Sequence, residues 1–126
     1  MTVPDGRYID MTKGLSEGLS DLRVSTPEVL RAFNDLGHAA MKPGSLDRKT
    51  KELIALAIGV ATRCDPCIGF HAQALAKLGA DQREVDEMLG VAVYMGGGPS
   101  LMHAVHARAA FEEFLQLHEP RHPSQL

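Results

Sequence analysis

The sequence contains no tryptophan and only 5% aromatic residues, so its core must be built mostly from aliphatic side chains and methionine. It also lacks segments in which β-branched residues alternate with polar ones, the pattern that is typical of strands. With 126 residues, the chain is long enough to bury a hydrophobic core without extra cross-links. These features predict one all-α domain over residues 1–126.

Other absences limit where the protein acts and what it binds. The longest apolar run, Leu53 to Ala61, is only about half of the roughly 20 residues that cross a membrane. Residues 1–5 lack the charged and apolar regions of a signal peptide. The net charge of −3 leaves no basic stripe to neutralise phosphates. The sequence therefore predicts a cytoplasmic protein with no membrane or nucleic-acid partner.

Helical signals, by contrast, are frequent and predict five or six helices. We expect residues 1–9 to be irregular, and a weak apolar stripe over residues 11–22 predicts a first helix. Ser25 and Glu28 have the spacing of a capping box, and Pro27 suits a first helical turn. A second helix is therefore expected to begin there.

The next helix has an unusual composition. Ser45 is expected to cap it, its first turn is polar, and residues 53–61 are apolar on every face. A helix without a polar face belongs in the middle of a bundle or in an interface. We therefore expect the protein to be an oligomer.

The remaining helices are marked by their ends. A helix over residues 67–78 is expected to stop at Gly79 in the C′ position. Asp81 opens a further helix, and the glycine-rich residues 96–99 predict a loop. A last helix is expected to run to about Leu117.

The two cysteines of the chain, Cys64 and Cys67, are separated by two residues, and His71 follows one helical turn later. In a cytoplasmic protein this spacing favours catalysis or metal binding over a structural disulfide. With Asp65 as the N-cap and Pro66 as the first helical residue, Cys67 lies in the first turn of its helix. Free backbone N–H groups and the helix dipole stabilise a thiolate there.

Two further groups are candidates for exchanging protons with this cysteine. His71 lies at i+4 from Cys67, so their side chains meet on one helix face, which we expect to point inward. Glu52 begins an apolar helix, where desolvation of its charged form favours proton exchange near neutral pH. Cys64 precedes the helix, nearer to solvent, and is close enough to attack an oxidised Cys67. Glu52, His71 and the two thiols thus form a candidate proton relay.

The pattern Glu52, Cys64-x-x-Cys67, His71 resembles the core signature of the AhpD-like alkylhydroperoxidases, one branch of the carboxymuconolactone decarboxylase superfamily. The resemblance covers roughly residues 45–110. It implies an all-helical bundle whose protomers associate as trimers or as hexamers.

The resemblance also implies a role for each residue. Cys67 is the nucleophile that reacts with a hydroperoxide and becomes a sulfenic acid. Cys64 first takes part in proton transfer and then resolves the sulfenic acid to a disulfide, while Glu52 and His71 relay protons. No flavin or nicotinamide motif is visible, so the electrons are expected from a dithiol protein of the lipoyl or thioredoxin type. The expected protein is a thiol-dependent peroxidase without a bound cofactor.

The chain departs from the best-characterised branch at two points. That branch has a histidine between the cysteines, where this chain has Pro66, and it has a long N-terminal half that this chain lacks. The chain therefore resembles the short, single-repeat members more closely. Loss of the histidine implies slower peroxide turnover and leaves a general disulfide reductase role open.

Other interpretations remain open. The cysteines could be two buried structural residues. Cys64, Cys67 and His71 could instead hold a metal ion, with His103 or His106 as the fourth ligand, in a redox-sensing or metal-binding protein. A cofactor-independent decarboxylase of the carboxymuconolactone type is a further alternative, although its chemistry needs no cysteine pair. Taken alone, both later histidines favour structural roles, with His103 facing an interior or an interface and His106 nearer the polar side.

Overall fold

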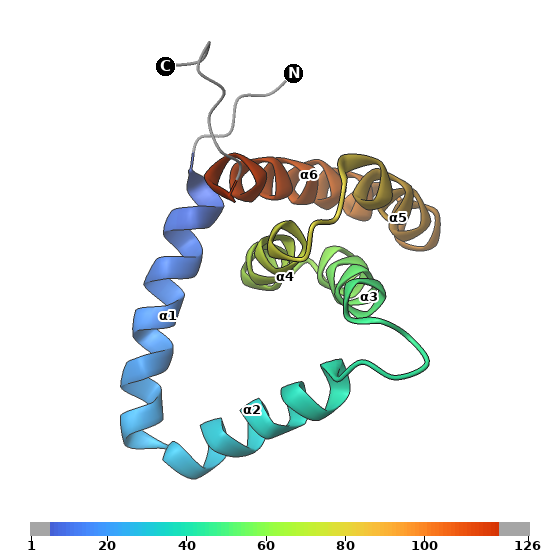
Figure 1. Cartoon of the computed structure of the whole chain (residues 1–126). Coiled ribbons are helices and arrows are strands. Elements are labelled where there is room, and N and C mark those ends of the chain that lie inside the picture. Colours follow the sequence, from blue (N-terminus) through green and yellow to red (C-terminus); the bar gives the residue numbers. More distant parts are fainter. Residues whose placement is uncertain (1–5, 119–126) are drawn as a thin grey trace.

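The computed structural model describes residues 6–118, which form six α-helices and no strand (Figure 1). The predicted all-α fold class is therefore confirmed. In chain order the helices are α1 (Arg7–Ser25), α2 (Pro27–Met41), α3 (Arg48–Ala61), α4 (Asp65–Lys77), α5 (Gln82–Gly96) and α6 (Gly98–His118).

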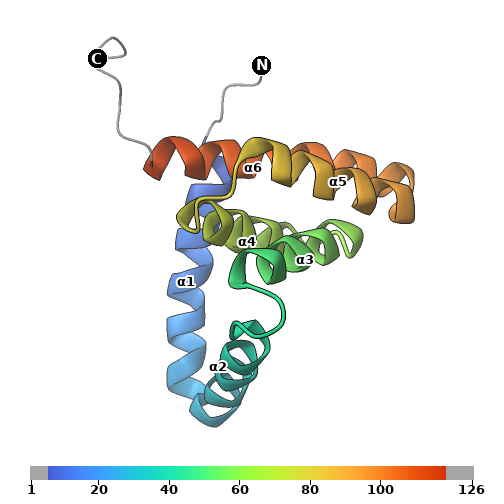
Figure 2. The same cartoon turned by 45° about the vertical axis from the view of Figure 1, so that its right-hand side comes forward.

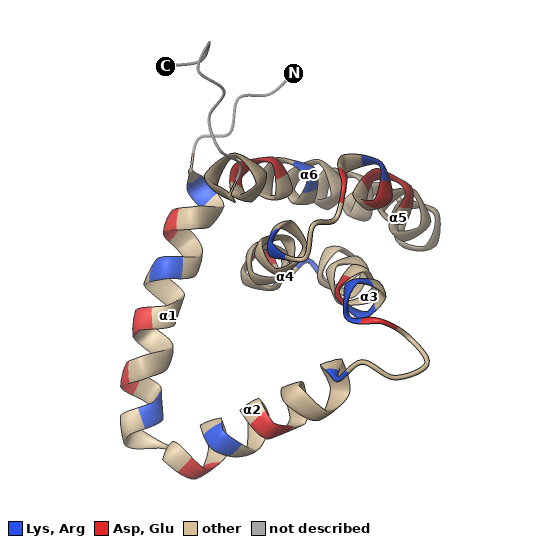
Figure 3. Cartoon of the chain, viewed as in Figure 1, with Lys and Arg blue, Asp and Glu red and all other residues tan. Residues whose placement is uncertain are grey.

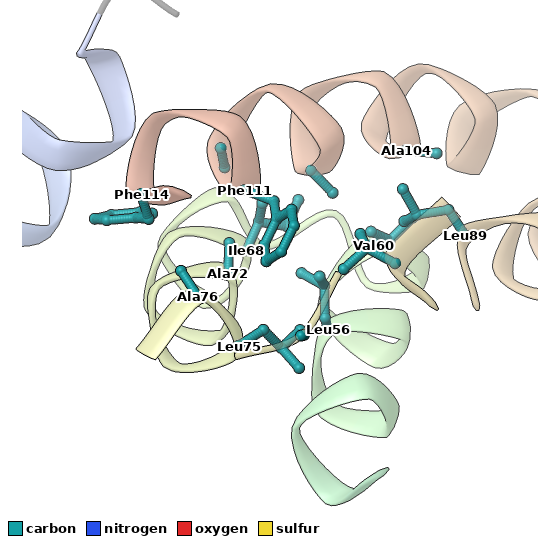
Figure 4. Packing of buried hydrophobic residues seen from close by; sticks show 14 of the residues in the cluster. Leu56, Val60, Ile68, Ala72, Leu75, Ala76, Leu89, Ala104, Phe111 and Phe114 are labelled. Atoms are coloured by element: carbon teal, nitrogen blue, oxygen red, sulfur yellow. The ribbon is translucent and has the colours of Figure 1, made fainter. Parts of the chain in front are cut away.

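The hydrophobic core lies among α3, α4, α5 and α6, whose side chains meet in the space between them (Figure 4). It is mostly aliphatic, as the low aromatic content predicts, and Tyr8, Phe111 and Phe114 are its aromatic members. Burying a large apolar side chain stabilises the fold by roughly 1.5–3 kcal/mol. The fully buried aliphatic side chains include Leu56, Val60, Ile68, Leu75 and Val85.

The helices α1 and α2 form an arm that leaves this core (Figures 1 and 2). The first turns of α1 pack on α4 and α6, and the backbone N–H of Tyr8 donates to Glu113 Oε2 at 2.9 Å. Within the described residues, α2 contacts α1 and α3 but no other helix. Its apolar residues Val29, Phe33 and Leu36 are therefore 63–69% exposed. A single chain leaves this helix face uncovered.

The predicted capping box at the start of α2 is wrong. The helix α1 continues through Ser25, whose hydroxyl donates to the carbonyl oxygen of Leu22 at 3.2 Å. The N-cap of α2 is Thr26, and its hydroxyl also donates to Leu22, at 3.0 Å. Both hydroxyls thus satisfy the end of α1, and no side chain caps α2. Pro27 does occupy its first turn, as expected.

Three other boundaries differ from the sequence predictions. The helix α1 begins at Arg7, inside the segment that was expected to be irregular. The N-cap of α3 is Asp47 rather than Ser45, because its carboxylate accepts from the N–H of Thr50 at 2.7 Å. Between α5 and α6 there is only Gly97, with φ 72°. One left-handed glycine therefore does what a longer loop was expected to do.

The turn between α4 and α5 follows the prediction. Gly79 has a left-handed backbone, with φ 79°. Asp81 caps α5, because its carboxylate accepts from the N–H of Glu84 at 2.8 Å. The carboxylate of Glu84 accepts in return from the N–H of Asp81 at 3.0 Å, which completes a capping box. Both signals are local in the sequence and were legible there.

Charged residues of both signs are interspersed along α1 and α2 (Figure 3). No described helix is long and apolar enough to cross a membrane. The cytoplasmic location and the absence of a nucleic-acid partner stay predictions.

The arm meets the core at a glycine on α4. A Cβ atom added to Gly69 would lie 2.9 Å from Thr12 Cγ2 and 3.4 Å from Tyr8 Cδ1. Both neighbours are themselves buried, at 4% and 2% exposure, and have little room to move. Gly69 therefore sets how closely α1 approaches α4.

Replacing Gly69 with alanine should lower the free energy of unfolding by roughly 1–3 kcal/mol, because the added methyl group overpacks this crossing. Urea denaturation of the purified protein measures the change. Gly14→Ala is the matched control, since nothing lies within 4 Å of a Cβ added there on the same arm. The control should be neutral or stabilised by up to about 1 kcal/mol. Equal stability of the two variants would contradict this account.

Candidate redox site

Cys64 and Cys67 are joined by a disulfide at the N-terminus of α4. Their Cα atoms are 5.2 Å apart, within the usual range for a disulfide. Cys67 lies in the first helical turn, as predicted. The N-cap, however, is Cys64 and not Asp65, because the Cys64 sulfur accepts from the N–H of Cys67 at 3.3 Å. The Cys64 sulfur therefore lies at the free N–H groups of the helix, where negative charge is stabilised once the disulfide is reduced.

A tight reversal between α3 and α4 sets this geometry. Arg63 adopts a left-handed backbone, with φ 58°, which is uncommon for a residue with a side chain. The N–H of Cys64 then donates back to the carbonyl oxygen of Gly59 at 2.9 Å. A Cβ atom on Gly59 would lie only 3.3 Å from Cys67 Cβ. The glycine lets the first turn of α4 lie directly against α3.

Glu52 and His71 meet across the same helix pair. His71 Nδ1 lies 2.7 Å from Glu52 Oε2, although 19 residues separate them. The Glu52 side chain is only 4% exposed, and Arg48 contacts its other oxygen at 3.4 Å. Because a carboxylate only accepts, Nδ1–H of His71 donates, and Nε2 keeps a lone pair for proton transfer. Glu52 and His71, two of the four members of the predicted relay, are therefore brought together.

The orientation of α4 differs in part from the prediction. The residues that face the core are Ile68, Ala72 and Leu75, which are fully buried. Cys67 and His71 lie beside this face and are half-buried, as is Cys64. At the other end of the helix, the C-cap residue Leu78 is 43% exposed. The site therefore lies at the edge of the core and is open to solvent.

One contact at this helix terminus has no local signal in the sequence. The hydroxyl of Tyr8, on α1, donates to Asp65 Oδ1 at 3.2 Å across 57 residues. Burial and, next, the Asp65 carboxylate raise the pKa of Tyr8 well above its usual range, so the phenol stays protonated. The i,i+4 contact of Arg48 with Glu52 was readable from spacing, but Tyr8 lies in the segment that was expected to be irregular.

The later histidines are placed elsewhere than the metal hypothesis required. Within residues 6–118, the one group of three or more His, Cys, Asp and Glu side chains close enough to share an ion is Asp65, His103 and His106. Cys64, Cys67 and His71 are not part of that group. The proposed set of two cysteines and two histidines is therefore not assembled in this disulfide-bonded form.

Comparison with known proteins agrees with the fold and with the family resemblance. A match to the carboxymuconolactone decarboxylase family covers residues 27–110. The crystal structure of a family protein from Legionella pneumophila is similar to this chain, with a TM-score of 0.87 and 51% sequence identity. The match covers 88% of this chain and 99% of that one. A family protein from Thermotoga maritima, for which an antioxidative role has been suggested, has TM-score 0.72 and 31% identity, covering 88% and 92%.

A sequence relative extends the comparison. An uncharacterised protein of Cupriavidus necator is 38% identical over 86 residues, which are 68% of this chain and 76% of the relative.

Glu52→Gln should slow the reaction of the reduced Cys67 thiol with iodoacetamide by about tenfold or more, because the carboxylate that orients His71 loses its charge. The rate is followed by mass spectrometry of the reduced protein. Glu112→Gln is the matched control, since Glu112 forms an i,i+4 pair with Arg108 at 2.6 Å, as Glu52 does with Arg48. Equal rates in both variants would remove Glu52 from the relay.

Proposed function

The chain belongs to the carboxymuconolactone decarboxylase family, and on that basis we propose that it is a thiol-dependent peroxidase or disulfide oxidoreductase. The observation that carries the proposal is the Cys64–Cys67 disulfide at a helix N-terminus, one turn from the paired His71 and Glu52. A disulfide is the oxidised product that such a cycle leaves, and the same thiols are its reduced starting point. The role suggested for the Thermotoga maritima protein supports this direction.

The proposed reaction has two steps on the enzyme. The Cys67 thiolate attacks the terminal oxygen of a hydroperoxide, the O–O bond breaks, and the alkoxide leaves as an alcohol after taking a proton. Cys67 is then a sulfenic acid. The Cys64 thiol attacks its sulfur, water leaves, and the disulfide forms. A dithiol protein of the lipoyl or thioredoxin type reduces the disulfide and is itself oxidised, which balances the cycle.

The surrounding groups have separate tasks in this scheme. His71 accepts the thiol proton through Nε2, while Glu52 holds its Nδ1–H and stabilises the imidazolium that forms. The positive end of the α4 dipole favours a thiolate at Cys67 in the first turn, while the N–H of Cys67 donates to the Cys64 sulfur. Pro66 stands between the cysteines in the first turn of α4, so no side chain at that position exchanges protons. Proton transfer rests on the Glu52–His71 pair, which fits either peroxide or disulfide reduction.

The decarboxylase activity after which the family is named is the alternative to a thiol-dependent activity. It needs no thiol pair, whereas here both cysteines of the chain lie at the site and form a disulfide. A redox-sensing protein with little turnover would use the same disulfide. Turnover with excess dithiol distinguishes these functions.

We also propose that the protein acts as a homo-oligomer, a trimer or a hexamer. On α3, Ile54 and Ile58 are 45% and 57% exposed, so the helix that is apolar on every face has only one face in this core. A shallow, mainly apolar depression of about 260 Å³ lies between α5 and α6, beside the exposed Leu101 and Val105. Together with the apolar face of α2, these are exposed apolar surfaces of the kind that mark protein–protein contacts. Copies of the chain would cover them.

Cys67→Ser should reduce hydroperoxide consumption by at least about 100-fold, because the nucleophile is removed. Cys64→Ser should react once and accumulate a sulfenic acid that dimedone traps. Peroxide loss with excess dihydrolipoamide measures the first result, and the mass of the adduct measures the second. Because the chain contains only two cysteines, Cys67 is the one thiol left in Cys64→Ser, so the site of the dimedone label is unambiguous. Undiminished turnover by Cys67→Ser would overturn the mechanism.

Phe33→Glu should lower the molar mass in solution, because it places a charge in the apolar face of α2, where Phe33 is 69% exposed in one chain. Size-exclusion chromatography with light scattering measures the mass. Arg31→Glu is the control on another side of the same helix and should leave the mass unchanged. A wild-type monomer would refute the proposed oligomer.

A further inference from the structure

A polar cluster that the thiol chemistry does not use lies beside the cysteines. It consists of Asp65, the first residue of α4, together with His103 and His106 of α6. One carboxylate oxygen and one ring nitrogen from each histidine all lie within 4.8 Å of one another. The histidines are three residues apart on one helix, a spacing that places both side chains on the same face.

The ring of His103 is held as metal-binding histidines commonly are. Its Nδ1 lies 3.0 Å from the carbonyl oxygen of Pro99, one turn earlier on α6. A carbonyl only accepts, so Nδ1 carries the proton and Nε2 carries the lone pair. A hydrogen bond of this kind fixes the tautomer and the orientation of a ligating imidazole.

His106 has a buried nitrogen that no hydrogen bond satisfies. Its Nδ1 has no hydrogen-bond partner, although the atom is inaccessible to water. The nearest acidic atom is Asp65 Oδ1 at 4.0 Å, which is an ion-pair distance but too long for a hydrogen bond. Two ligands held tetrahedrally at about 2.0–2.1 Å from a zinc ion lie roughly 3.4 Å apart. A shift of about half an ångström, within ordinary side-chain movement, brings the two atoms to that separation.

The remaining contacts of Asp65 orient its carboxylate and still leave lone pairs that can bind a metal ion. The Tyr8 hydroxyl donates to Oδ1 at 3.2 Å, and Arg7 Nη2 lies 3.8 Å from Oδ2. Oδ1 therefore lies toward His106 and retains a lone pair. The hydrogen bond from Tyr8 fixes the orientation of the carboxylate, as hydrogen bonds to metal-ligating carboxylates commonly do.

We propose that Asp65, His103 and His106 bind a divalent transition-metal ion, with Zn²⁺ as the best fit. Two imidazoles and one carboxylate are ligands that such an ion prefers, and three protein ligands leave one coordination position open. The site is separate from the Glu52–His71 pair. Because Asp65 stands between the two cysteines, a bound ion would tie this segment to α6.

The test uses the oxidised protein, in which the disulfide removes both thiols as ligands. Isothermal titration with Zn²⁺ should show one site per chain, and Mg²⁺ should not compete for it. His103→Ala and His106→Ala should each weaken binding at least tenfold. His38→Ala, which removes an exposed histidine of α2, is the matched control and should bind as the wild type does.

Co²⁺ provides a second readout that does not depend on affinity alone. It should produce visible d–d bands without a thiolate charge-transfer band, and His106→Ala should abolish them. Circular dichroism verifies folding of each variant, and His106→Gln replaces any alanine variant that does not fold. Zn²⁺ binding that is absent from the wild type, or unchanged in the His103→Ala/His106→Ala double variant, would overturn the proposal.

Discussion

The contact between α3 and the first turn of α4 positions every group in the redox site. The buried stripe of α3 runs through Glu52, Leu56 and Gly59, at the spacing of one helix face. Gly59 admits Cys67 to close contact, and two turns earlier Glu52 reaches His71 on the same side. A bulkier residue at position 59 would separate the helices and lengthen the distance between carboxylate and imidazole. One packing constraint therefore determines both the environment of the cysteines and the Glu52–His71 pairing.

A buried carboxylate is costly unless it is paired and hydrogen-bonded. Glu52 meets this requirement through Arg48 on one oxygen and His71 on the other. The carboxylate of Asp65, on the other side of the cysteine pair, is contacted by Arg7 and Tyr8. The disulfide thus lies between two separate polar clusters, one from α3 and one that joins α1 to α6. The first cluster reaches α4 at His71, in its second turn, and the other reaches it at Asp65, its first residue.

The architecture separates the site from one of the surfaces that the single chain leaves uncovered, the apolar face of α2. The core and the cysteines belong to α3, α4, α5 and α6, while α1 and α2 project away from them (Figure 1). The arm is anchored through Tyr8, Thr12 and Gly69, which lie close behind the cysteine-bearing turn. An oligomer built on α2 would therefore be linked to the redox site through α1.

Much of the fold and the main site residues were predictable from local patterns. Gly79, the Asp81 capping box and the place of Cys67 in a first turn depend on neighbours within a few residues. The prediction failed where two helix ends compete for the same groups, as at Ser25, whose hydroxyl serves the end of α1. It also missed the N-cap at position 64, where a sulfur atom replaces the usual carboxylate or hydroxyl.

The sequence by itself determined the helices and the chemistry available, because helical periodicity, caps and the spacing of Cys64, Cys67 and His71 are local. Only the tertiary structure decided which distant groups meet. Tyr8 and Asp65, or Asp65 and His106, come together because side-chain packing sets the distances and rotations of α1, α4 and α6. A shift of one residue along a helix turns the side-chain direction by about 100° about the helix axis. The periodicity of the sequence does not specify how one helix is rotated relative to its neighbour.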